Sequence, residues 1–262
     1  MLKTRVITAI AALAIIAVVL VVLPRLWAEV VIGLLLLVGA WEWSGFLETG
    51  RTGVQATFTA IVAGCLVAVH FATPAQAEWI LIVASAWWLV AFVWTLRFPT
   101  PIPSVVRWIS GILVIVPLFL ALCMLLRLGV EYLLFILLIV WVADGGAYFA
   151  GKAFGRVKLA PAISPGKTWE GVVGGFALVT LLAVAVAVWR DVSIGVLVPF
   201  CLAVAAISIV GDLTVSMFKR TAGIKDSGTL FPGHGGVLDR IDSVAAAAPL
   251  FVLGLGRLGV AL

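Results

Sequence analysis

Long apolar runs alternate with short polar connections along this chain. A membrane-spanning helix needs about 20 mostly apolar residues to cross a hydrocarbon core of about 30 Å. Only a helix satisfies all backbone hydrogen bonds within one such segment, so each run is predicted to be a helix. The nine predicted spans are residues 6–23, 27–46, 55–72, 78–96, 106–126, 131–150, 171–189, 192–211 and 243–262.

The composition agrees with this pattern. Of 262 residues, 64% are apolar and 11% are charged, and the mean hydropathy is +1.28. Soluble globular proteins are about half apolar and a quarter charged. Cys65, Cys123 and Cys201 lie in separate apolar runs with no disulfide or metal-ligand spacing. These features exclude a soluble enzyme, a disordered chain and a disulfide scaffold, and they predict an all-α polytopic membrane protein.

The distribution of basic residues predicts the orientation. With the N-terminus in the cytoplasm, thirteen of the 17 Lys and Arg residues lie in cytoplasmic segments, and Arg25, Arg127, Arg190 and Arg257 lie outside. Cytoplasmic loops carry such an excess, so we predict a cytoplasmic N-terminus and an external C-terminus. The net charge of +5 then reports orientation, and no nucleic-acid partner is expected. We expect a bacterial inner membrane, because the chain is short and shows no appended soluble domain.

Polar residues divide the chain into two parts. Residues 1–130 hold five predicted spans with few polar side chains, and we interpret them as a membrane scaffold. Residues 131–262 hold four predicted spans and two longer connections, 151–170 and 212–242, both cytoplasmic in the predicted topology. These two connections contain nearly all the glycine-rich and charged sequence, so the second part is predicted to be the catalytic domain.

The densest polar stretch runs from residue 212 to residue 242. It contains four aspartates, four basic residues and one of the two histidines. If its first part is helical, one face carries a carboxylate, a hydroxyl and two cations, because positions i, i+4, i+7 and i+8 are neighbours. That face consists of Asp212, Ser216, Lys219 and Arg220. Asp239 and Asp242 are likewise neighbours, at i and i+3 on the helix that enters the last span.

This stretch is suited to a metal and a polyphosphate. Gathered carboxylates repel one another and resist desolvation, and a divalent cation would relieve both costs. Oxygen ligands without clustered Cys or His favour Mg²⁺ or Mn²⁺ over zinc. The glycine-rich segment 228–236 lets backbone N–H groups approach phosphate oxygens. The positive-inside rule would explain the basic residues here, but not four aspartates, a histidine and the Gly235–Gly236 pair.

A second cluster begins at Asp144, inside the sixth predicted span. An ionisable group there costs roughly 3 kcal/mol and is a functional candidate for that reason. Tyr148, Gly151 and Gly155 follow Asp144 on the same helical stripe. The two glycines could serve the site or form a small-xxx-small packing motif, and both interpretations stay open.

The segment 164–171, S-P-G-K-T-W-E-G, is a third candidate. Its G-K-T is similar to a P-loop, but that motif needs a preceding strand and a glycine at position 161, which is proline. We therefore reject the P-loop. Ser164, Lys167 and Thr168 remain candidates for phosphate binding, with Thr168 or Glu170 capping the seventh span.

Other polar residues carry weaker signals. His70 lies at the outer end of the third predicted span and is interpreted as interfacial. Glu42, between Trp41 and Trp43, is interpreted as marking a helix end. The basic, proline-containing loop 97–107 could contact anionic lipid headgroups, although the positive-inside rule explains it equally well.

Residues 216–242 resemble the phosphatidate cytidylyltransferases, also called CDP-diacylglycerol synthases. The family pattern is S-x-Φ-K-R-x4-K-D-x-small-x2-Φ-P-x-H-G-G-Φ-x-D-R-Φ-D, where Φ is apolar, and this chain matches it without departure. The stripe from Asp144 and the segment 164–171 are also similar to the family. The resemblance is therefore close over 144–242 and rests on hydropathy elsewhere.

The resemblance implies a reaction of CTP with phosphatidic acid, giving CDP-diacylglycerol and pyrophosphate, with Mg²⁺ and a second cation such as K⁺. It also implies a homodimer in the lipid bilayer. We predict that Asp212 and Asp239 ligate the metal, with Asp144 and Asp242 as further ligand candidates. His234 would donate to the leaving pyrophosphate or order its loop. The predicted phosphate- and substrate-binding residues are Ser164, Lys167, Ser216, Lys219, Arg220, Lys225, Asp226, Gly235, Gly236 and Arg240.

The site is predicted at the cytoplasmic ends of the sixth, eighth and ninth spans, in a polar cavity open sideways to lipid. Two other classes of membrane protein are alternatives. An ion-coupled transporter would need paired interrupted helices in two halves, and no such symmetry is present. Another lipid-phosphate enzyme, such as a lipid kinase or a CDP-alcohol phosphotransferase, is the second alternative, but the D-G-x2-A-R context of the latter is absent.

Overall fold

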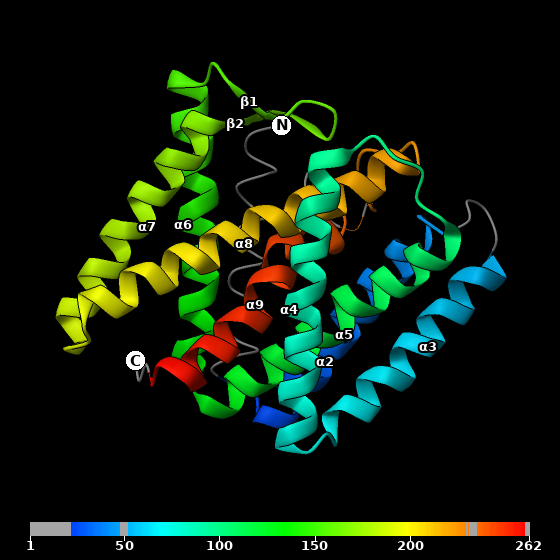
Figure 1. Cartoon of the computed structure of the whole chain (residues 1–262). Coiled ribbons are helices and arrows are strands. Elements are labelled where there is room, and N and C mark those ends of the chain that lie inside the picture. The colour runs from blue at the N-terminus through cyan, green and yellow to red at the C-terminus, as the bar shows by residue number, and fades with distance from the viewer. Residues whose placement is uncertain (1–21, 48–51, 229, 231–234, 260–262) are drawn as a thin grey trace.

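Long helices make up almost the whole fold (Figure 1). The computed structural model describes residues 22–47, 52–228, 230 and 235–259. The helices are α2 (Arg25–Ser44), α3 (Thr52–His70), α4 (Pro74–Arg97), α5 (Ser104–Leu128), α6 (Val130–Phe154), α7 (Trp169–Arg190), α8 (Ile194–Thr221) and α9 (Leu238–Leu258). Two short strands, β1 (Lys158–Ala160) and β2 (Ser164–Thr168), lie between α6 and α7.

The predicted spans correspond closely to these helices. Within the described ranges, eight helices are long and apolar enough to cross a membrane, and they coincide with the second to the ninth predicted span. The first predicted span, 6–23, lies outside the described residues. The chain is therefore a polytopic α-helical membrane protein, while its orientation stays a prediction.

The predicted connection 212–242 is wrong in its bounds. Helix α8 does not end at residue 211 but continues to Thr221, with 28 residues in all, and α9 already begins at Leu238. The extra turns are held by packing, because Val215, Met217 and Phe218 are fully buried. Phe218 packs against Trp43 of α2 with ring centroids 5.0 Å apart. Polar residues recur here at helical spacing among buried apolar residues. The last turns of α8 therefore have one polar face, and the rest of their surface is buried.

The predicted all-α class misses one small feature, an antiparallel β-hairpin in the connection 151–170. Lys158 pairs with Thr168, and Ala160 pairs with Ser164. The hairpin leads directly into α7, whose first turn is capped by the Thr168 hydroxyl, which accepts from the Gly171 N–H at 3.2 Å. The G-K-T triplet lies inside β2 and not in a loop between strand and helix, in agreement with the rejection of a P-loop.

Helices α6 and α7 pack side by side through small residues (Figure 1). A Cβ on Gly146 would lie 2.9 Å from the Gly175 Cα, and one on Gly171 would lie 2.8 Å from the Ala147 carbonyl oxygen. Gly151 faces Thr168 and Gly171 in the same interface. Of the two interpretations left open for Gly151, this contact supports helix packing.

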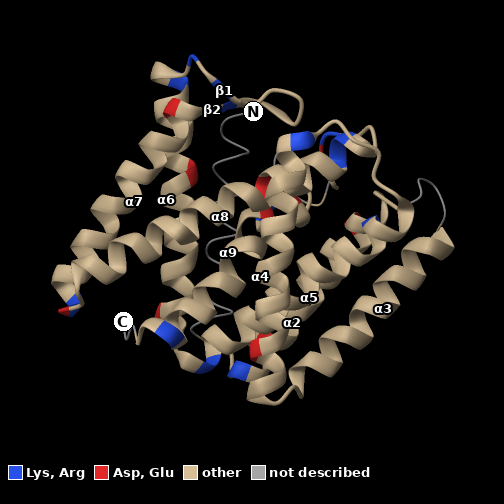
Figure 2. Cartoon of the chain, viewed as in Figure 1, with Lys and Arg blue, Asp and Glu red and all other residues tan. Residues whose placement is uncertain are grey.

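Charged residues lie mostly at the helix ends, and the middle of the bundle is apolar (Figure 2). Helix α5 is the most enclosed, with buried residues along most of its length. Helices α8 and α9 cross close together at Gly211, where an added Cβ would collide with the Asp242 carbonyl oxygen. This close crossing places the acidic residues of α8 and α9 beside each other.

Candidate functional site

Asp212 of α8 connects the helix to the hairpin. Its Oδ2 lies 2.7 Å from the Nζ of Lys167 on β2, and its Oδ1 accepts a hydrogen bond from the Ser216 hydroxyl at 3.1 Å. The second contact confirms the predicted helical face, on which residues i and i+4 meet. The contact of Lys167 with Asp212 joins β2 to α8, and the sequence analysis did not predict this pairing.

Asp239, in the first turn of α9, is held by contacts to both carboxylate oxygens. Its Oδ1 accepts from the Lys219 Nζ at 2.7 Å, and its Oδ2 accepts from the backbone N–H groups of Ser227 and Gly236 at 3.0 and 2.9 Å. Gly235 has φ +80°, and a Cβ there would collide with the Asp239 carboxylate. Only glycine combines this backbone angle with so close an approach. Asp239 therefore binds both Ser227 and Gly236, on the two sides of the connection between α8 and α9.

The other two aspartates are less compensated. Asp242 is buried one turn after Asp239, and its Oδ1 accepts a hydrogen bond from the Ser243 N–H at 2.8 Å. Asp144 is exposed on α6. The charge of Asp212 acts on both, and the charge of Lys167 opposes it at both. Like charges at short range raise the free energy of the site unless cations balance them.

Two lysines balance the charge of the two predicted primary metal ligands: Lys167 pairs with Asp212, and Lys219 pairs with Asp239. Within the described ranges, no three Asp, Glu, His or Cys side chains come close enough to enclose a metal ion by themselves. Mg²⁺ commonly uses one or two carboxylates together with substrate phosphates and water, so the oxygen-only donor set fits it. The ligand roles of Asp144, Asp212, Asp239 and Asp242 stay predictions.

Arg220 bridges the end of α8 to two neighbouring segments. Its Nε donates to the Ile163 carbonyl in the hairpin at 3.1 Å, and its Nη1 donates to the Ile224 carbonyl at 3.4 Å. Lys225, Asp226 and Arg240 are exposed.

Ser164, Gly236 and His234 complete the predicted set. Ser164 is half-buried on β2, and Gly236 is buried against α2. His234 lies outside the described residues. The structure thus brings the hairpin, the end of α8 and the start of α9 together, and the substrate-binding roles stay predictions.

Glu42 is a site residue that the sequence reasoning missed. It lies in the last turn of α2, as interpreted, but its carboxylate is buried and accepts from the N–H groups of Val237 and Leu238 at 3.0 and 2.8 Å. It also accepts from the Ser227 hydroxyl at 3.0 Å. The positive end of the α9 dipole favours a carboxylate at this point. The available signal was an acid inside an apolar run, which is costly unless it has partners.

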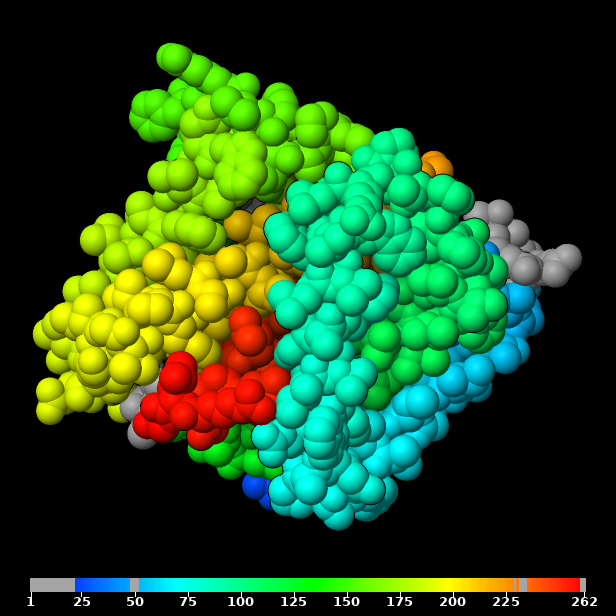
Figure 3. Space-filling view, in the orientation of Figure 1, coloured from blue at the N-terminus to red at the C-terminus, as the bar shows by residue number. Residues whose placement is uncertain are grey.

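An apolar groove adjoins this centre. Its volume is about 340 Å³, and it is lined by α4, the hairpin, α7 and α8 (Figure 3). Leu213 of α8 lines it directly beside Asp212, and Ile163 lines it where Arg220 binds the hairpin. Leu96 and Trp169 are exposed at its edges. The lining of this groove is almost entirely apolar, and the polar cavity open sideways to lipid stays a prediction.

Comparisons with known proteins identify the family of the chain. The model of the cytidylyltransferase family matches residues 3–256. The chain is 42% identical over 263 residues to a phosphatidate cytidylyltransferase of Pseudomonas aeruginosa, with 96% of each chain covered. It is 35% identical over 284 residues to a protein of the same name from Haemophilus influenzae, covering 96% of this chain and 97% of the relative. The chain therefore belongs to the cytidylyltransferase family, and it is a nucleotidyltransferase.

Proposed function

We propose that the chain transfers CMP from CTP to phosphatidic acid, giving CDP-diacylglycerol and pyrophosphate. The observation that carries the proposal is the Asp212–Lys167 and Asp239–Lys219 pairs beside an apolar groove. Paired acids and cations suit a nucleoside triphosphate, and an apolar groove suits acyl chains. The names of the two relatives support the same substrates.

The reaction is an in-line displacement at the α-phosphorus of CTP. A phosphate oxygen of phosphatidic acid forms the new P–O bond, and the bond to the β-phosphate breaks, releasing pyrophosphate. A phosphate monoester has its second pKa near 6, so the nucleophile is ionised at neutral pH and needs no strong general base. Catalysis then rests on positioning and on neutralising charge.

The chain's own residues have distinct parts in this proposal. Lys167, Lys219 and Arg220 hold the triphosphate, because their charged groups converge from β2 and the end of α8. Asp239 and Glu42 position the loop before α9 by accepting its backbone N–H groups. Mg²⁺ bound by Asp212 and Asp239, with Asp144 and Asp242 as further candidates, would neutralise phosphate charge and orient the reacting oxygens. A second cation such as K⁺ remains part of the prediction.

The groove suggests how the lipid substrate reaches the site. Phosphatidic acid leaves the bilayer only at high cost, whereas CTP is water-soluble. Acyl chains lying between α4 and α7 would place the lipid phosphate near Lys167 and Asp212. We place this end of the bundle at the cytoplasmic face of a bacterial inner membrane, because the basic residues favour that orientation.

Radiolabelled CTP tests the function directly. Purified protein in mixed micelles receives phosphatidic acid, Mg²⁺ and CTP labelled at either the α- or the γ-phosphate. We expect the α-label in the lipid and the γ-label in pyrophosphate. Transfer of the γ-label to lipid would identify a kinase instead. Absence of both labels from the lipid, with protein that is folded and phosphatidic acid present, would contradict the proposal.

A further inference from the structure

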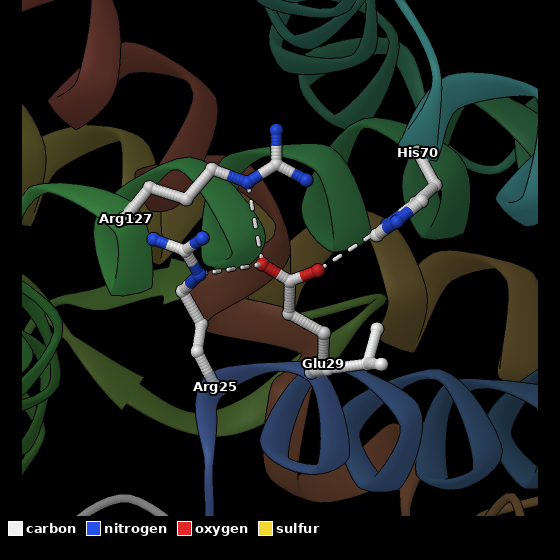
Figure 4. Close-up of a pocket in the computed structure, with 5 residues that line it drawn as sticks. Arg25, Glu29, His70 and Arg127 are labelled. Carbon is white, nitrogen blue, oxygen red and sulfur yellow. Dashed lines mark hydrogen bonds and ion pairs between the residues drawn. The ribbon is translucent and has the colours of Figure 1, made fainter.

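A second cavity lies at the opposite end of α2 from the candidate active site. Its volume is about 370 Å³, and its lining residues are Arg25, Leu26, Glu29, His70 and Arg127 (Figure 4). They come from the first turns of α2 and the last turns of α3 and α5. Glu29 is thirteen residues before Glu42 on the same helix, which corresponds to about 20 Å at 1.5 Å per residue. The cavity is therefore separate from the site described above.

One buried carboxylate organises this cavity. The Glu29 side chain is only 4% exposed, and its Oε1 lies 3.2 Å from the Arg127 Nε and 3.9 Å from the Arg25 Nε. Its Oε2 lies 3.2 Å from the His70 Nδ1. Glu29 therefore joins α2, α3 and α5, and His70 is a partner in this cluster as well as a helix-end residue.

The cluster contains more positive than negative charge. Two guanidinium groups, which stay ionised at any physiological pH, face a single carboxylate. Both arginines contact Glu29 through Nε, and among the described residues neither uses its terminal Nη groups in a hydrogen bond or ion pair. The Arg25 and Arg127 side chains are 63% and 40% exposed. Figure 4 shows the two guanidinium groups close to one another beside Glu29.

A phosphate group is the ligand that this arrangement fits. Arginine forks bind phosphate oxygens by paired, charge-assisted hydrogen bonds. Leu26 lines the cavity and is 60% exposed, and the neighbouring Trp27 is equally exposed. Exposed apolar and aromatic residues at a helix end are typical of the membrane interface. The surroundings therefore favour a phosphate that belongs to a lipid.

We propose that this cavity binds the phosphate headgroup of an anionic phospholipid from the leaflet opposite the candidate active site. The Nη groups of Arg25 and Arg127 hold the phosphate, and Glu29 and His70 fix the two arginines in place. A bound headgroup stabilises the ends of α2, α3 and α5, because a ligand that binds only the folded state lowers its free energy.

Lipid retention by the full-length chain in detergent tests this proposal. The protein is mixed with equal amounts of phosphatidylglycerol and phosphatidylcholine, and retained lipid is measured by native mass spectrometry. We expect a preference for phosphatidylglycerol that Arg25→Gln lowers by about 10-fold, since hydrogen bonds to charged groups are the strong ones. Arg25 is the chosen position because its 3.9 Å contact to Glu29 is the longest in the cluster, so the variant should fold.

Arg190→Gln is the matched control. Arg190 ends α7 on the same predicted side of the membrane and stacks on Trp189, with 4.8 Å from its guanidinium carbon to the ring centroid. The control should retain the wild-type preference. An equal loss in both variants, or no loss in Arg25→Gln, would overturn the proposal. Inorganic phosphate that raises the unfolding midpoint as strongly as phosphatidylglycerol, at equal phosphate concentration, would also overturn the assignment to lipid.

Discussion

Helix α2 carries a buried glutamate near each end, and the two carboxylates have different kinds of partners. Glu42 accepts hydrogen bonds from two backbone N–H groups at the start of α9 and from the Ser227 hydroxyl in the connection before it. Glu29 faces two arginines and a histidine at the edge of a cavity. Glutamate therefore binds backbone N–H groups at one end of α2 and charged side chains at the other.

The difference has a physical consequence. Backbone donors are fixed by the helix that carries them, so Glu42 holds α9 and the preceding loop in one position. Arginine side chains have several donors and can be shared with an incoming anion. The Glu42 end is thus suited to rigid positioning for chemistry, and the Glu29 end is suited to a ligand that binds and leaves. Four substitutions test this contrast.

The largest effect is expected from Asp212→Asn, at the catalytic end. Loss of its charge removes the partner of Lys167 and a proposed metal ligand, so turnover should fall by about 100-fold or more. The measurement is incorporation of α-labelled CTP into lipid at saturating Mg²⁺. Asp191→Asn is the control, because Asp191 is exposed with φ +56°, a conformation that Asn adopts readily. Near-normal turnover of Asp212→Asn would remove Asp212 from the site.

Glu42→Gln should have the next largest effect. The amide keeps one acceptor oxygen but places an NH₂ group against backbone donors, so we expect a loss of about 2 kcal/mol in unfolding free energy. Turnover should fall by roughly 10-fold through the displaced loop. Glu78→Gln, at an exposed pair with Arg257, should change neither. Wild-type stability and turnover of Glu42→Gln would show that the hydrogen bonds between Glu42 and the start of α9 are not required for either.

Gly236→Ala tests the same contact between Glu42 and the start of α9 by adding a methyl group beside the carboxylate. A Cβ at this position would collide with the Glu42 carboxylate, so the substitution should destabilise the protein by about 1–3 kcal/mol. Gly64→Ala is the control, because nothing lies within 4 Å of a Cβ there and alanine favours the helix. Unfolding midpoints in detergent distinguish the two. Equal midpoints would mean that the loop can move away from Glu42 at little cost.

Glu29→Gln should have the smallest effect on turnover, within about 3-fold, because the cluster lies about 20 Å from the candidate active site. Stability should fall by about 1–2 kcal/mol, since Arg25 and Arg127 lose a counter-charge. A fall in turnover as large as that of Asp212→Asn would show that the two ends of α2 are not independent.

Much of this architecture follows from local properties of the sequence. Crossing a bilayer requires an apolar run of fixed length, so the eight described helices coincide with predicted spans. Helical spacing alone placed Ser216 next to Asp212, and a hydrogen bond joins them. The polar residues at the end of α8 predict a connection there, whereas packing of residues such as Phe218 keeps this part helical.

The contacts that complete the site depend on distant parts of the chain. Lys167 lies on a hairpin that no long periodic pattern predicted, and its pairing with Asp212 follows from the packing of that hairpin on α8. Glu42 reaches donors that are almost 200 positions away. An acid in an apolar run signals that a partner exists, but only the packed structure identifies it.

The length of α8 has a consequence for the setting of the enzyme. A helix of 28 residues extends about 42 Å, which exceeds the hydrocarbon thickness of about 30 Å. Asp212, Ser216 and Lys219 lie on its last turns, and Gly211 locks it against α9. The helix itself therefore sets the distance of these groups from the other end of α8. Bilayers of different thickness should change how far the lipid phosphate must rise to meet them, so activity should depend on acyl-chain length in the surrounding membrane.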